Sequence, residues 1–364
     1  MKVKIGDLTK IRTGKLDANA SSEDGQYPFF TCSRETLKIS TYSYDCECVL
    51  VAGNGDLNVK YYNGKFDAYQ RTYIIEDNGS GKLFMPYLYY FMEGYIEELR
   101  KQAIGGVIKY IKLGNLTDAL IELPSVDEQK TIVDILEKSK KVLDMRHEEI
   151  SKLDDLIKAR FVEMFGDAIH NDKGWETDEV EKLCKEIYGG GTPSKLHSEY
   201  YEDGDIPWIS SKDMKTDVLT DSQIKINQLG VDNSTARMVP INSVIMVIRS
   251  GILKHTLPVA INVVPITVNQ DLKVFIPNER VLTRFLAVQF KMHEKDILSG
   301  VRVVTADNIE FNSLKQRKLI VPPIELQQEY VSFVEQIDKS KVAVQKALDE
   351  AQLLFDSLMQ EYFG

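Results

Sequence analysis

The sequence predicts an α+β protein in which two related mixed α/β domains alternate with two long helices. We expect the helices to form an antiparallel coiled coil with pseudo-two-fold symmetry. Three observations predict this fold. The phrase "LPSVDEQKTIVDIL", which begins at Leu123, returns as "VPPIELQQEYVSFV" at Val321. Apolar stripes at helical spacing follow both copies, and the segments that precede the two copies are also similar to each other.

The repeat aligns residues 123–166 with residues 321–364 without a gap, so that Gln129 matches Gln327 and each copy ends in "FG". Such a period is too long for a solenoid and indicates a duplicated two-part unit. The boundaries expected from the repeat are 1–122 for the first domain, 123–167 for the first helical block, 168–320 for the second domain and 321–364 for the second helical block.

Each helical block carries an apolar stripe with 4-3 spacing. The stripes consist of Ile132, Leu136, Leu143, Ile150, Leu153, Ile157 and Met164 in the first block, and of Tyr330, Val334, Ile337, Val344, Leu348, Ala351, Phe355, Leu358 and Tyr362 in the second. Sustained 4-3 spacing is typical of a coiled coil. Two amphipathic helices on separate cores are the alternative, but neither block contains a glycine before its terminal "FG". We therefore expect the two helices to pack on each other.

The two domains share short β-rich phrases that end in turns. "GQYPFFTCS" from Gly25 resembles "GDIPWISSK" from Gly204, and "VLVAGNG" resembles "IMVIRSG". "AYQRTYII" resembles "VNQDLKVFI", which aligns Gln70 with Gln270. Runs of this kind predict strands followed by glycine turns. Helices are expected at residues 85–101 and 282–298, so each domain is mixed.

Composition limits the class of protein. The 364 residues carry a net charge of −10, and the two helical blocks hold eight of these negative charges. Each domain is therefore nearly neutral, which permits a basic face without demonstrating one. No apolar run is long enough to span a membrane, and the start "MKVKIGDLTK" lacks the apolar core of a signal peptide, so a cytoplasmic protein is expected. The spacing of the four cysteines, Cys32, Cys46, Cys48 and Cys184, predicts reduced thiols.

Catalytic motifs are not found, and the chain is expected not to be an enzyme. "GSGK" at Gly79 lacks the remainder of a phosphate-binding loop, and "HEEIS" at His147 lacks the second histidine of a zinc protease. Asp118, Glu128 and Lys130 could imitate a nuclease cluster, but Glu128 and Lys130 fall at the start of a helical block. A solvated helix start is the simpler interpretation, and no metal or catalytic residue is predicted.

Three features resemble the specificity subunit of Type I restriction–modification systems. They are the two Pro-to-Gln helix starts (Pro124–Gln129 and Pro322–Gln327), the long helices that end in "FG", and the phrases "GGGTPSK" and "GDIPWISSKDM" in the second domain. The resemblance covers nearly the whole chain. One departure is Leu326 before Gln327, where the family has an acidic residue, and this substitution puts a partner contact in doubt.

The resemblance implies two target-recognition domains, each of which recognises one half of a bipartite site on double-stranded DNA. It implies two helical spacers and no catalysis by the chain itself. The expected partners are two methyltransferase subunits, which modify adenine, and restriction subunits. No cofactor is expected in this chain, whereas the partners are expected to use S-adenosylmethionine, ATP and magnesium.

DNA recognition requires Arg or Lys for phosphates and guanine, and Asn or Gln for adenine, presented on loops. The candidates in the first domain are Ser33, Arg34, Asn54, Lys60, Tyr69, Gln70, Arg71 and Lys109. Those in the second are Thr192, Ser194, Lys195, Ser211, Lys212, Arg249, Lys254, Asn269, Gln270 and Arg302. Trp208 and Phe29 are expected to belong to the core rather than to stack on bases.

Two other functions stay open on the sequence alone. One is a nucleic-acid-processing enzyme with a nuclease site hidden in one domain. The other is an adaptor that uses its coiled coil to bridge proteins and does not contact DNA.

Overall fold

The computed structural model describes residues 1–303 and 307–364, with only the backbone described for residues 302 and 303. The chain divides into two compact units, one made of Met1–Glu149 and Val344–Gly364 and the other of Ile150–Ala343. The two predicted long helices are α4 (Val126–Phe165) and α10 (Ile324–Phe363). Each of them contributes one half to each unit, so each unit is a domain with two half-helices.

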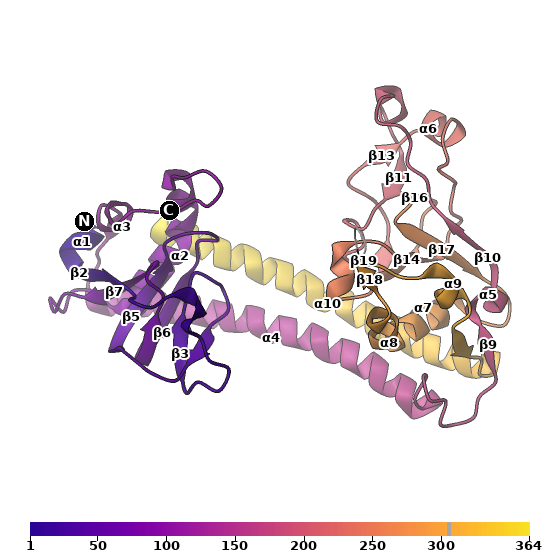
Figure 1. Ribbon diagram of the computed structural model, residues 1–364, viewed down its shortest axis with the longest axis horizontal. Coiled ribbons are helices and arrows are strands. Elements are labelled where there is room, and N and C mark those ends of the chain that lie inside the picture. Colours follow the sequence, from indigo (N-terminus) through magenta and orange to yellow (C-terminus); the bar gives the residue numbers. More distant parts are fainter. Residues whose placement is uncertain (304–306) are drawn as a thin grey trace. The chain divides into compact units, whose positions relative to one another are not determined.

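The first unit is built on a six-stranded sheet with the order β2-β7-β5-β6-β3-β4. Figure 1 shows α2 (Met85–Gln102) packed beside this sheet. A separate two-stranded ladder, β1 with β8, joins the first residues of the chain to the segment before α4. The strands are β1 (Lys2–Lys4), β2 (Thr9–Thr13), β3 (Tyr27–Phe30), β4 (Leu37–Ile39), β5 (Tyr44–Ala52), β6 (Val59–Ala68), β7 (Thr72–Asp77) and β8 (Leu120–Glu122), and the short helices are α1 (Ile5–Leu8) and α3 (Leu113–Thr117).

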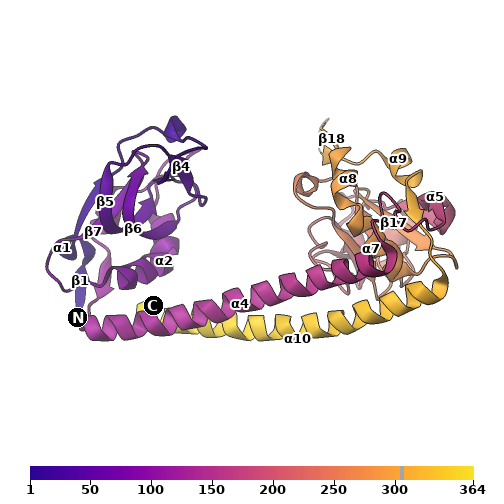
Figure 2. The same cartoon turned by 90° about the horizontal axis from the view of Figure 1, so that it is seen from below.

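The second unit contains a five-stranded sheet, β10-β17-β14-β15-β12, and a three-stranded sheet, β13-β11-β16. Two-stranded ladders pair β9 with β20 and β18 with β19. The strands are β9 (Thr177–Glu179), β10 (Cys184–Gly189), β11 (Ile206–Ile209), β12 (Val218–Leu219), β13 (Lys225–Ile226), β14 (Val244–Val247), β15 (Val259–Asn262), β16 (Thr267–Val268), β17 (Leu272–Pro277), β18 (Arg302–Val303), β19 (Asp307–Asn308) and β20 (Lys318–Ile320). The helices are α5 (Val180–Leu183), α6 (Gln228–Asp232), α7 (Thr283–Met292), α8 (Glu294–Ser299) and α9 (Phe311–Lys315), of which α7 and α8 are labelled in Figure 2.

The two domains share a common strand arrangement, as the paired phrases predicted, and the second domain adds β12, which pairs parallel with β15. Phe29 of β3 lies opposite Asp67 in a parallel pair with β6, and Trp208 of β11 lies opposite Thr267 in a parallel pair with β16. The long strand β6 of the first domain corresponds to β15 and β16 together, which are separated by residues 263–266. Phe29 and Trp208 are both buried in the core, as predicted.

The helix expected at residues 282–298 is wrong in one respect, because it is two helices. The break falls at His293, whose backbone (φ −89°, ψ 3°) both ends α7 and begins α8. His293 itself is buried at this break, with 2 % of its surface exposed.

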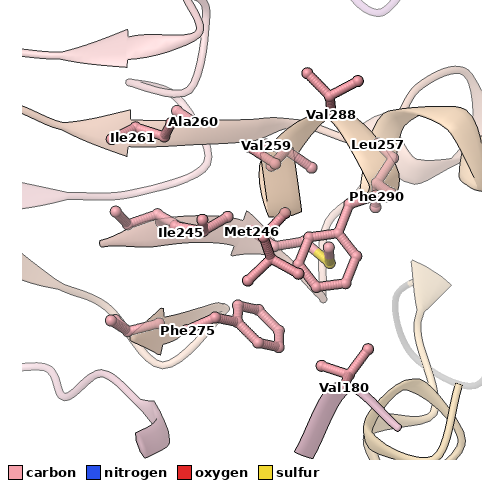
Figure 3. Packing of buried hydrophobic residues seen from close by; sticks show 14 of the residues in the cluster. Val180, Ile245, Met246, Leu257, Val259, Ala260, Ile261, Phe275, Val288 and Phe290 are labelled. Atoms are coloured by element: carbon pink, nitrogen blue, oxygen red, sulfur yellow. The ribbon is translucent and has the colours of Figure 1, made fainter. Parts of the chain in front are cut away.

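The core of the second domain lies between α7 and the central strands. Figure 3 shows Phe290 of α7 beside Met246 of β14, and both belong to one buried cluster with Val259 and Val288. The rings of Phe290 and Phe275 lie 5.0 Å apart between centroids. The sheet and the helix therefore form two layers, which leaves the loops at the strand ends to carry polar groups.

A buried glutamine fastens the start of α4 to the first domain. The Gln129 side chain is 0 % exposed. Its Nε2 donates to the carbonyl oxygens of Lys82 and Pro124, each at 2.9 Å, and its Oε1 accepts from the backbone N–H of Phe84 at 2.8 Å. The Lys82 and Phe84 groups lie at the entrance to α2 and the Pro124 group lies just before α4, so one side chain satisfies backbone groups of both segments.

Gln327 makes the same contacts at the start of α10. Its Nε2 donates to the carbonyl oxygens of Arg280 at 2.9 Å and Pro322 at 2.8 Å, and its Oε1 accepts from the N–H of Leu282 at 3.0 Å. The repeated Pro-to-Gln phrase is therefore explained by one arrangement, here named the glutamine clamp, which occurs once in each unit. An amide is needed because only an amide offers an acceptor and two donors at its tip.

The "FG" phrases end both long helices inside a core. Phe165 is fully buried and its ring packs edge-on against Phe285 of α7, with the centroids 5.0 Å apart. Gly166 follows with φ 77°, a left-handed conformation that stops the helix. The ring of Phe363 lies 5.1 Å from that of Tyr87 in α2, which is the matching place in the first unit.

The two half-helices of the second unit run antiparallel, as predicted. Tyr330 Oη of α10 donates to the Ile157 carbonyl of α4 at 3.1 Å. Asp154, earlier in α4, pairs with Lys341, later in α10, so the residue numbers run in opposite directions along the contact. Lys341 interrupts the apolar stripe of α10 and is satisfied by this carboxylate.

Burial follows the predicted stripe in the first unit as well. Leu143, Val344 and Leu348 are 7–9 % exposed, whereas Leu353 on the other side of α10 is 70 % exposed. In the second unit Leu153 is half-buried and Ile157 is buried. The stripe therefore faces protein, although not every member is fully covered.

We expect Gln327→Leu to lower the stability of the second unit by on the order of 3 kcal/mol, because the N–H of Leu282 and two carbonyls lose their partners without access to water. The exposed neighbour Gln328 offers a matched control, and Gln328→Leu should change stability by less than about 0.5 kcal/mol. Both tryptophans, Trp175 and Trp208, belong to the second unit, so the urea midpoint of tryptophan fluorescence reports this change. Equal midpoints for the two variants would show that the clamp does not stabilise the domain.

We expect Leu348→Asp to cost several kcal/mol, because it places a carboxylate among the apolar side chains between the helices. Leu353→Asp, on the exposed side of the same helix, should cost about 0.5 kcal/mol or less. Leu153→Asp is expected to destabilise the second unit in the same way. Thermal melts followed by circular dichroism measure all three, and identical melts for Leu348→Asp and Leu353→Asp would contradict the packing.

Candidate nucleic-acid interface

Polar residues of the first domain gather where β5 passes into β6. The N–H of Gly53 donates to the Arg71 carbonyl at 2.8 Å, and the N–H of Gly55 donates to the Lys109 carbonyl at 3.0 Å. Between these two glycines lies Asn54, whose backbone bridges to Tyr110. Three segments that are far apart in the sequence are thereby brought together, and each supplies a predicted DNA contact.

Lys60 ties the loop after β3 to the same place. Its Nζ donates to the Ser33 carbonyl at 2.6 Å and to Asn58 Oδ1 at 2.7 Å. Burial lowers the pKa of Lys60 below its usual value. The ammonium therefore acts first as a structural donor, and Ser33 is held through its backbone with its side chain exposed.

Arg34 is held by a carboxylate in this group. Its Nε lies 2.7 Å from Asp56 Oδ2, and Arg100 from the last turn of α2 lies 3.1 Å from Asp56 Oδ1. The hydrogen bond from Arg34 is the main reason that the pKa of Asp56 is lowered. Exposed ion pairs of this kind contribute about 0–1 kcal/mol to stability, so their presence is not explained by the fold alone.

Tyr69 and Gln70 lie on the neighbouring turn before β7. Gln70 Nε2 donates to Asp17 Oδ1 at 2.9 Å, and the Gln70 N–H donates to the Leu16 carbonyl. Tyr69 is half-buried and its N–H donates to the Phe30 carbonyl at 2.9 Å. Seven of the eight candidates of the first domain thus lie in loops, and the eighth, Lys60, lies at the start of β6 and contacts one of these loops.

A half-open cavity of about 390 Å³ adjoins these loops. It combines aromatic faces with two cations, and its lining consists of Pro28, Phe30, Arg34, Thr36, Lys60, Tyr61 and Tyr62. Aromatic rings beside Arg and Lys are typical of surfaces that stack on bases and bind phosphates.

Arg249 is the centre of the corresponding group in the second domain. Its Nε lies 2.7 Å from Asp271 Oδ1 and one terminal nitrogen lies 2.5 Å from the same oxygen. Asp271 is itself fixed, since Asn269 Nδ2 donates to its other oxygen at 3.2 Å. Lys254 lies 3.9 Å from the buried carboxylate of Asp307, at the far side of the same turn.

The remaining candidates of the second domain fall into two groups. Thr192 donates a hydrogen bond to Gln270 beside the Arg249 group. Ser211 and Lys212 lie on the turn after β11, which is tied to this place because the N–H of Asn269 donates to the Ile209 carbonyl at 2.9 Å.

Ser194 and Lys195 lie farther along the loop from Thr192. Within residues 1–303 and 307–364, no side-chain hydrogen bond connects them to Arg249. Arg302 is in β18, whose partner Asn308 bridges to Arg249, but its side chain is outside the described part of the chain.

The polar loops of the two domains lie at matching places in the shared strand arrangement, but their residue types differ. The N–H of Gly53 donates to the Arg71 carbonyl in one domain, and the N–H of Arg249 donates to the Asp271 carbonyl in the other. Gly53 of the first domain therefore corresponds to Arg249 of the second. Arg71 of the first domain corresponds to Asp271 of the second. Two related frames with different polar groups can recognise two different base sequences.

Sequence reasoning missed the carboxylates. Asp56 and Asp271 organise the two groups, yet a search for DNA contacts favours basic and amide side chains. Arg100 was missed because it lies at the end of a helix rather than in a loop. The Asn-X-Asp spacing of Asn269 and Asp271, typical of a side chain that hydrogen-bonds its own turn, is the one signal that was available.

A second cavity, of about 440 Å³, lies near the junction of α8 and α9, away from these loops. It is lined by Ile169, His293, Glu310, Asn312, Ser313, Gln316, Arg317 and Lys318. Burial is the main reason that the pKa of His293 falls from 6.5 to about 4, and the charge of Arg317 lowers it further. The ring is therefore neutral near pH 7, and Arg317 lies 3.4 Å from its Nδ1.

Neither a metal centre nor a membrane helix is found in the described residues. Over residues 1–303 and 307–364, no three His, Cys, Asp or Glu side chains are placed to share a metal ion. The supposed nuclease trio is dispersed, because Glu128 accepts from Ser125 in a helix cap and Asp118 pairs with Lys4. The same residues contain no helix that is long and apolar enough to cross a bilayer. The four cysteines are free.

Comparisons with known proteins agree on one family. The sequence profile of the Type I restriction modification DNA specificity domain matches residues 1–154 and 172–351. The specificity subunit of the Type I restriction enzyme EcoDI of Escherichia coli is 44 % identical over 135 residues, which is 37 % of this chain and 30 % of that protein. The EcoR124I/EcoR124II specificity subunit of the same species is 30 % identical over 285 residues, 76 % of this chain and 68 % of that protein.

The fold agrees with a solved structure of the same class. The Type I restriction–modification S subunit from M. genitalium aligns over 100 % of this chain and 96 % of its own, with a TM-score of 0.62 at 15 % sequence identity. At this identity the likeness concerns the fold alone.

We expect His293 to make the second unit acid-labile. The unfolded chain binds a proton at this imidazole near pH 6.5, whereas the folded chain binds it only near pH 4. Stability is therefore highest above pH 6.5 and falls between about pH 6.5 and 4, by up to about 1.4 kcal/mol per pH unit. Tryptophan-monitored urea midpoints should show that His293→Gln removes this part of the pH dependence.

His170 serves as the control, because its sign is opposite. Its exposed ring pairs with Asp167, which raises the pKa of His170, so its contribution is present below pH 6.5 and is lost as the pH rises. His170→Gln should leave the decline between pH 6.5 and 4 in place. A wild-type protein with no excess decline over His293→Gln would contradict the assignment.

Proposed function

The chain belongs to the Type I restriction–modification DNA specificity family, and from this premise we propose that it is the DNA-recognition subunit of such a system. The protein binds double-stranded DNA at a bipartite, asymmetric site and directs adenine methylation, and restriction, by partner subunits. The first domain recognises one half of the site and the second domain recognises the other.

One observation carries this proposal. Two domains with a common strand arrangement present polar loops at the same end of their sheets, but with different residues in matching places, such as Gly53 against Arg249. A protein that only bridged other proteins would have no need for two such groups. Different groups on one frame are expected of a subunit that recognises two unlike half-sites.

The chain itself is proposed to have no catalytic role. Its partners are two methyltransferase subunits and the restriction subunits, and these are the components that use S-adenosylmethionine, ATP and magnesium. We place the complex in the cytoplasm, where the chain meets its DNA. Incubating the purified chain alone with DNA and magnesium tests the alternative of a hidden nuclease, since cleavage would contradict a purely recognising role.

Exchanging residues 168–320 for the matching segment of a relative should replace one half of the methylated sequence and preserve the other. The physical reason is that each domain forms its polar loops from its own strands, while Gln327 in the retained helix bonds the exchanged domain only through backbone groups. The gap between the half-sites should be unchanged, because both helical blocks are retained. Long-read sequencing of DNA from cells that also express the methyltransferase subunit measures the methylated sequence.

The reciprocal exchange of residues 1–122 is the control and should change the opposite half. A single exchange that altered both halves together would show that the two domains recognise DNA jointly, which contradicts the modular proposal.

A further inference from the structure

In both domains an aspartate carboxylate accepts a hydrogen bond from Nε of an arginine, which is here called the inner edge of the guanidinium group. Asp56 accepts from Nε of Arg34, whose side chain is 69 % exposed. Asp271 accepts from Nε and one terminal nitrogen of Arg249, whose side chain is 47 % exposed. The arrangement occurs twice, although the residues involved lie at different places in the shared frame.

This contact leaves the outer edge of each guanidinium group, formed by its two terminal nitrogens, available to bind a ligand. The group is planar and carries five N–H bonds, of which the two terminal nitrogens present a parallel pair pointing away from the side chain. Among the described residues, Arg34 has no hydrogen-bond partner besides Asp56. For Arg249 the contacts with Asp271 occupy the inner edge, and within the described chain its second terminal nitrogen has no partner.

A parallel pair of N–H donors fits the two acceptors that guanine shows in the major groove, O6 and N7. Phosphate also accepts such a pair. The aspartate carboxylate favours guanine over phosphate for two reasons. It offsets the positive charge that attracts phosphate, and it fixes the plane of the guanidinium group. A fixed plane favours a flat, directional base edge over a phosphate that can be approached from many sides.

The carboxylates are held in place by further contacts. Asp56 also binds Arg100, which is anchored because it donates to the Leu57 carbonyl at 3.3 Å. Asp271 receives hydrogen bonds from Asn269 and donates its own N–H to Asn269 Oδ1 at 3.0 Å. Each arginine is thus oriented before any DNA arrives, which reduces the entropy lost on binding.

We propose that Arg34 and Arg249 each recognise one guanine, one in each half of the DNA site, and that Asp56 and Asp271 position them. This inference rests on the proposed function, because it names the base that each domain selects. It predicts that both halves of the recognised sequence contain a G·C pair.

The first test changes the DNA and leaves the protein intact. The full chain is purified with its methyltransferase subunit, and its binding is measured on duplexes in which single guanines of the mapped site are replaced by 7-deazaguanine, which lacks N7. We expect one guanine in each half whose replacement weakens binding roughly 5- to 150-fold, equivalent to about 1–3 kcal/mol. A site in which no such replacement weakens binding overturns the inference.

The second test assigns each guanine to its arginine. Arg34→Lys should make the complex indifferent to 7-deazaguanine in one half only, and Arg249→Lys in the other half only, because an ammonium cannot make the bidentate contact. Asp56→Asn and Asp271→Asn should reduce the same discrimination and raise binding to unrelated DNA. If Asp56→Asn leaves the discrimination unchanged, Asp56 has no positioning role.

Arg12→Lys and Arg280→Lys are matched controls, since each arginine pairs with a carboxylate outside the loop groups, Arg12 with Glu76 and Arg280 with Asp178. Both variants should retain the full response to 7-deazaguanine. Mapping of methylation in cells distinguishes a failure of the proposed function from a failure of the guanine inference. A wild-type chain that directs no methylation contradicts the proposed function itself, whereas a mapped sequence with a half lacking any G·C pair contradicts the guanine inference alone.

Discussion

The glutamine clamp is the constraint on which the rest of the structure depends. A long helix cannot stay in a fixed orientation to a small domain through apolar contacts alone, because such contacts have no preferred direction. Gln129 and Gln327 supply direction, since each joins three backbone groups at the point where a spacer helix, the preceding strand and the loop before α2 or α7 converge. The same joint of three hydrogen bonds therefore occurs at the start of the spacer helix in both units.

The two glutamine clamps belong to the part of the structure that recurs in both halves of the chain, whereas the loops at the far end of the sheets differ between the halves. Helix starts, glutamines and terminal phenylalanines recur in both halves of the chain, and they all contact backbone or core. The loops at the far end of the sheets are joined to this frame by backbone hydrogen bonds, such as those of Gly53 and Arg249, and by side-chain contacts such as that of Arg100 with Asp56. A backbone hydrogen bond does not itself require one particular side chain, although a Cβ at Gly53 would lie 2.3 Å from the Arg71 carbonyl oxygen. Substitution in these loops can therefore change the DNA sequence that is recognised without loss of the fold.

Sequence reasoning predicted the long helices and the related domains because both are written as repeats. Val344 and Leu348 are buried where 4-3 spacing placed them, and the paired phrases correspond to the same strand pairs in both domains. The break at His293 was not predictable, because the residues on both sides of it have helical periodicity. The ion pairs of Asp56 and Asp271 with arginines were not predictable, since a contact between segments remote in sequence leaves no local pattern, and the Asn-X-Asp spacing at Asp271 indicates only its own turn. The side chains that touch bases stay predictions, because recognition depends on placement within about an ångström, which periodicity does not encode.

The packing of Phe363 against Tyr87 has a consequence for how the protein is made. The ribosome completes the first domain long before it reaches residue 363, and at about 5–20 residues per second the delay is roughly 10–50 s. Throughout that interval the apolar face of α2, including Tyr87 and Phe91, lacks the half of α10 that covers it in the finished fold. The nascent chain therefore lacks the segment that packs on these apolar side chains in the finished fold. While the second domain is being translated, the uncovered apolar face of α2 exposes the first domain to aggregation. Slow elongation prolongs this exposure. A chain that terminates early keeps the face uncovered and becomes a substrate for chaperones rather than a functional subunit.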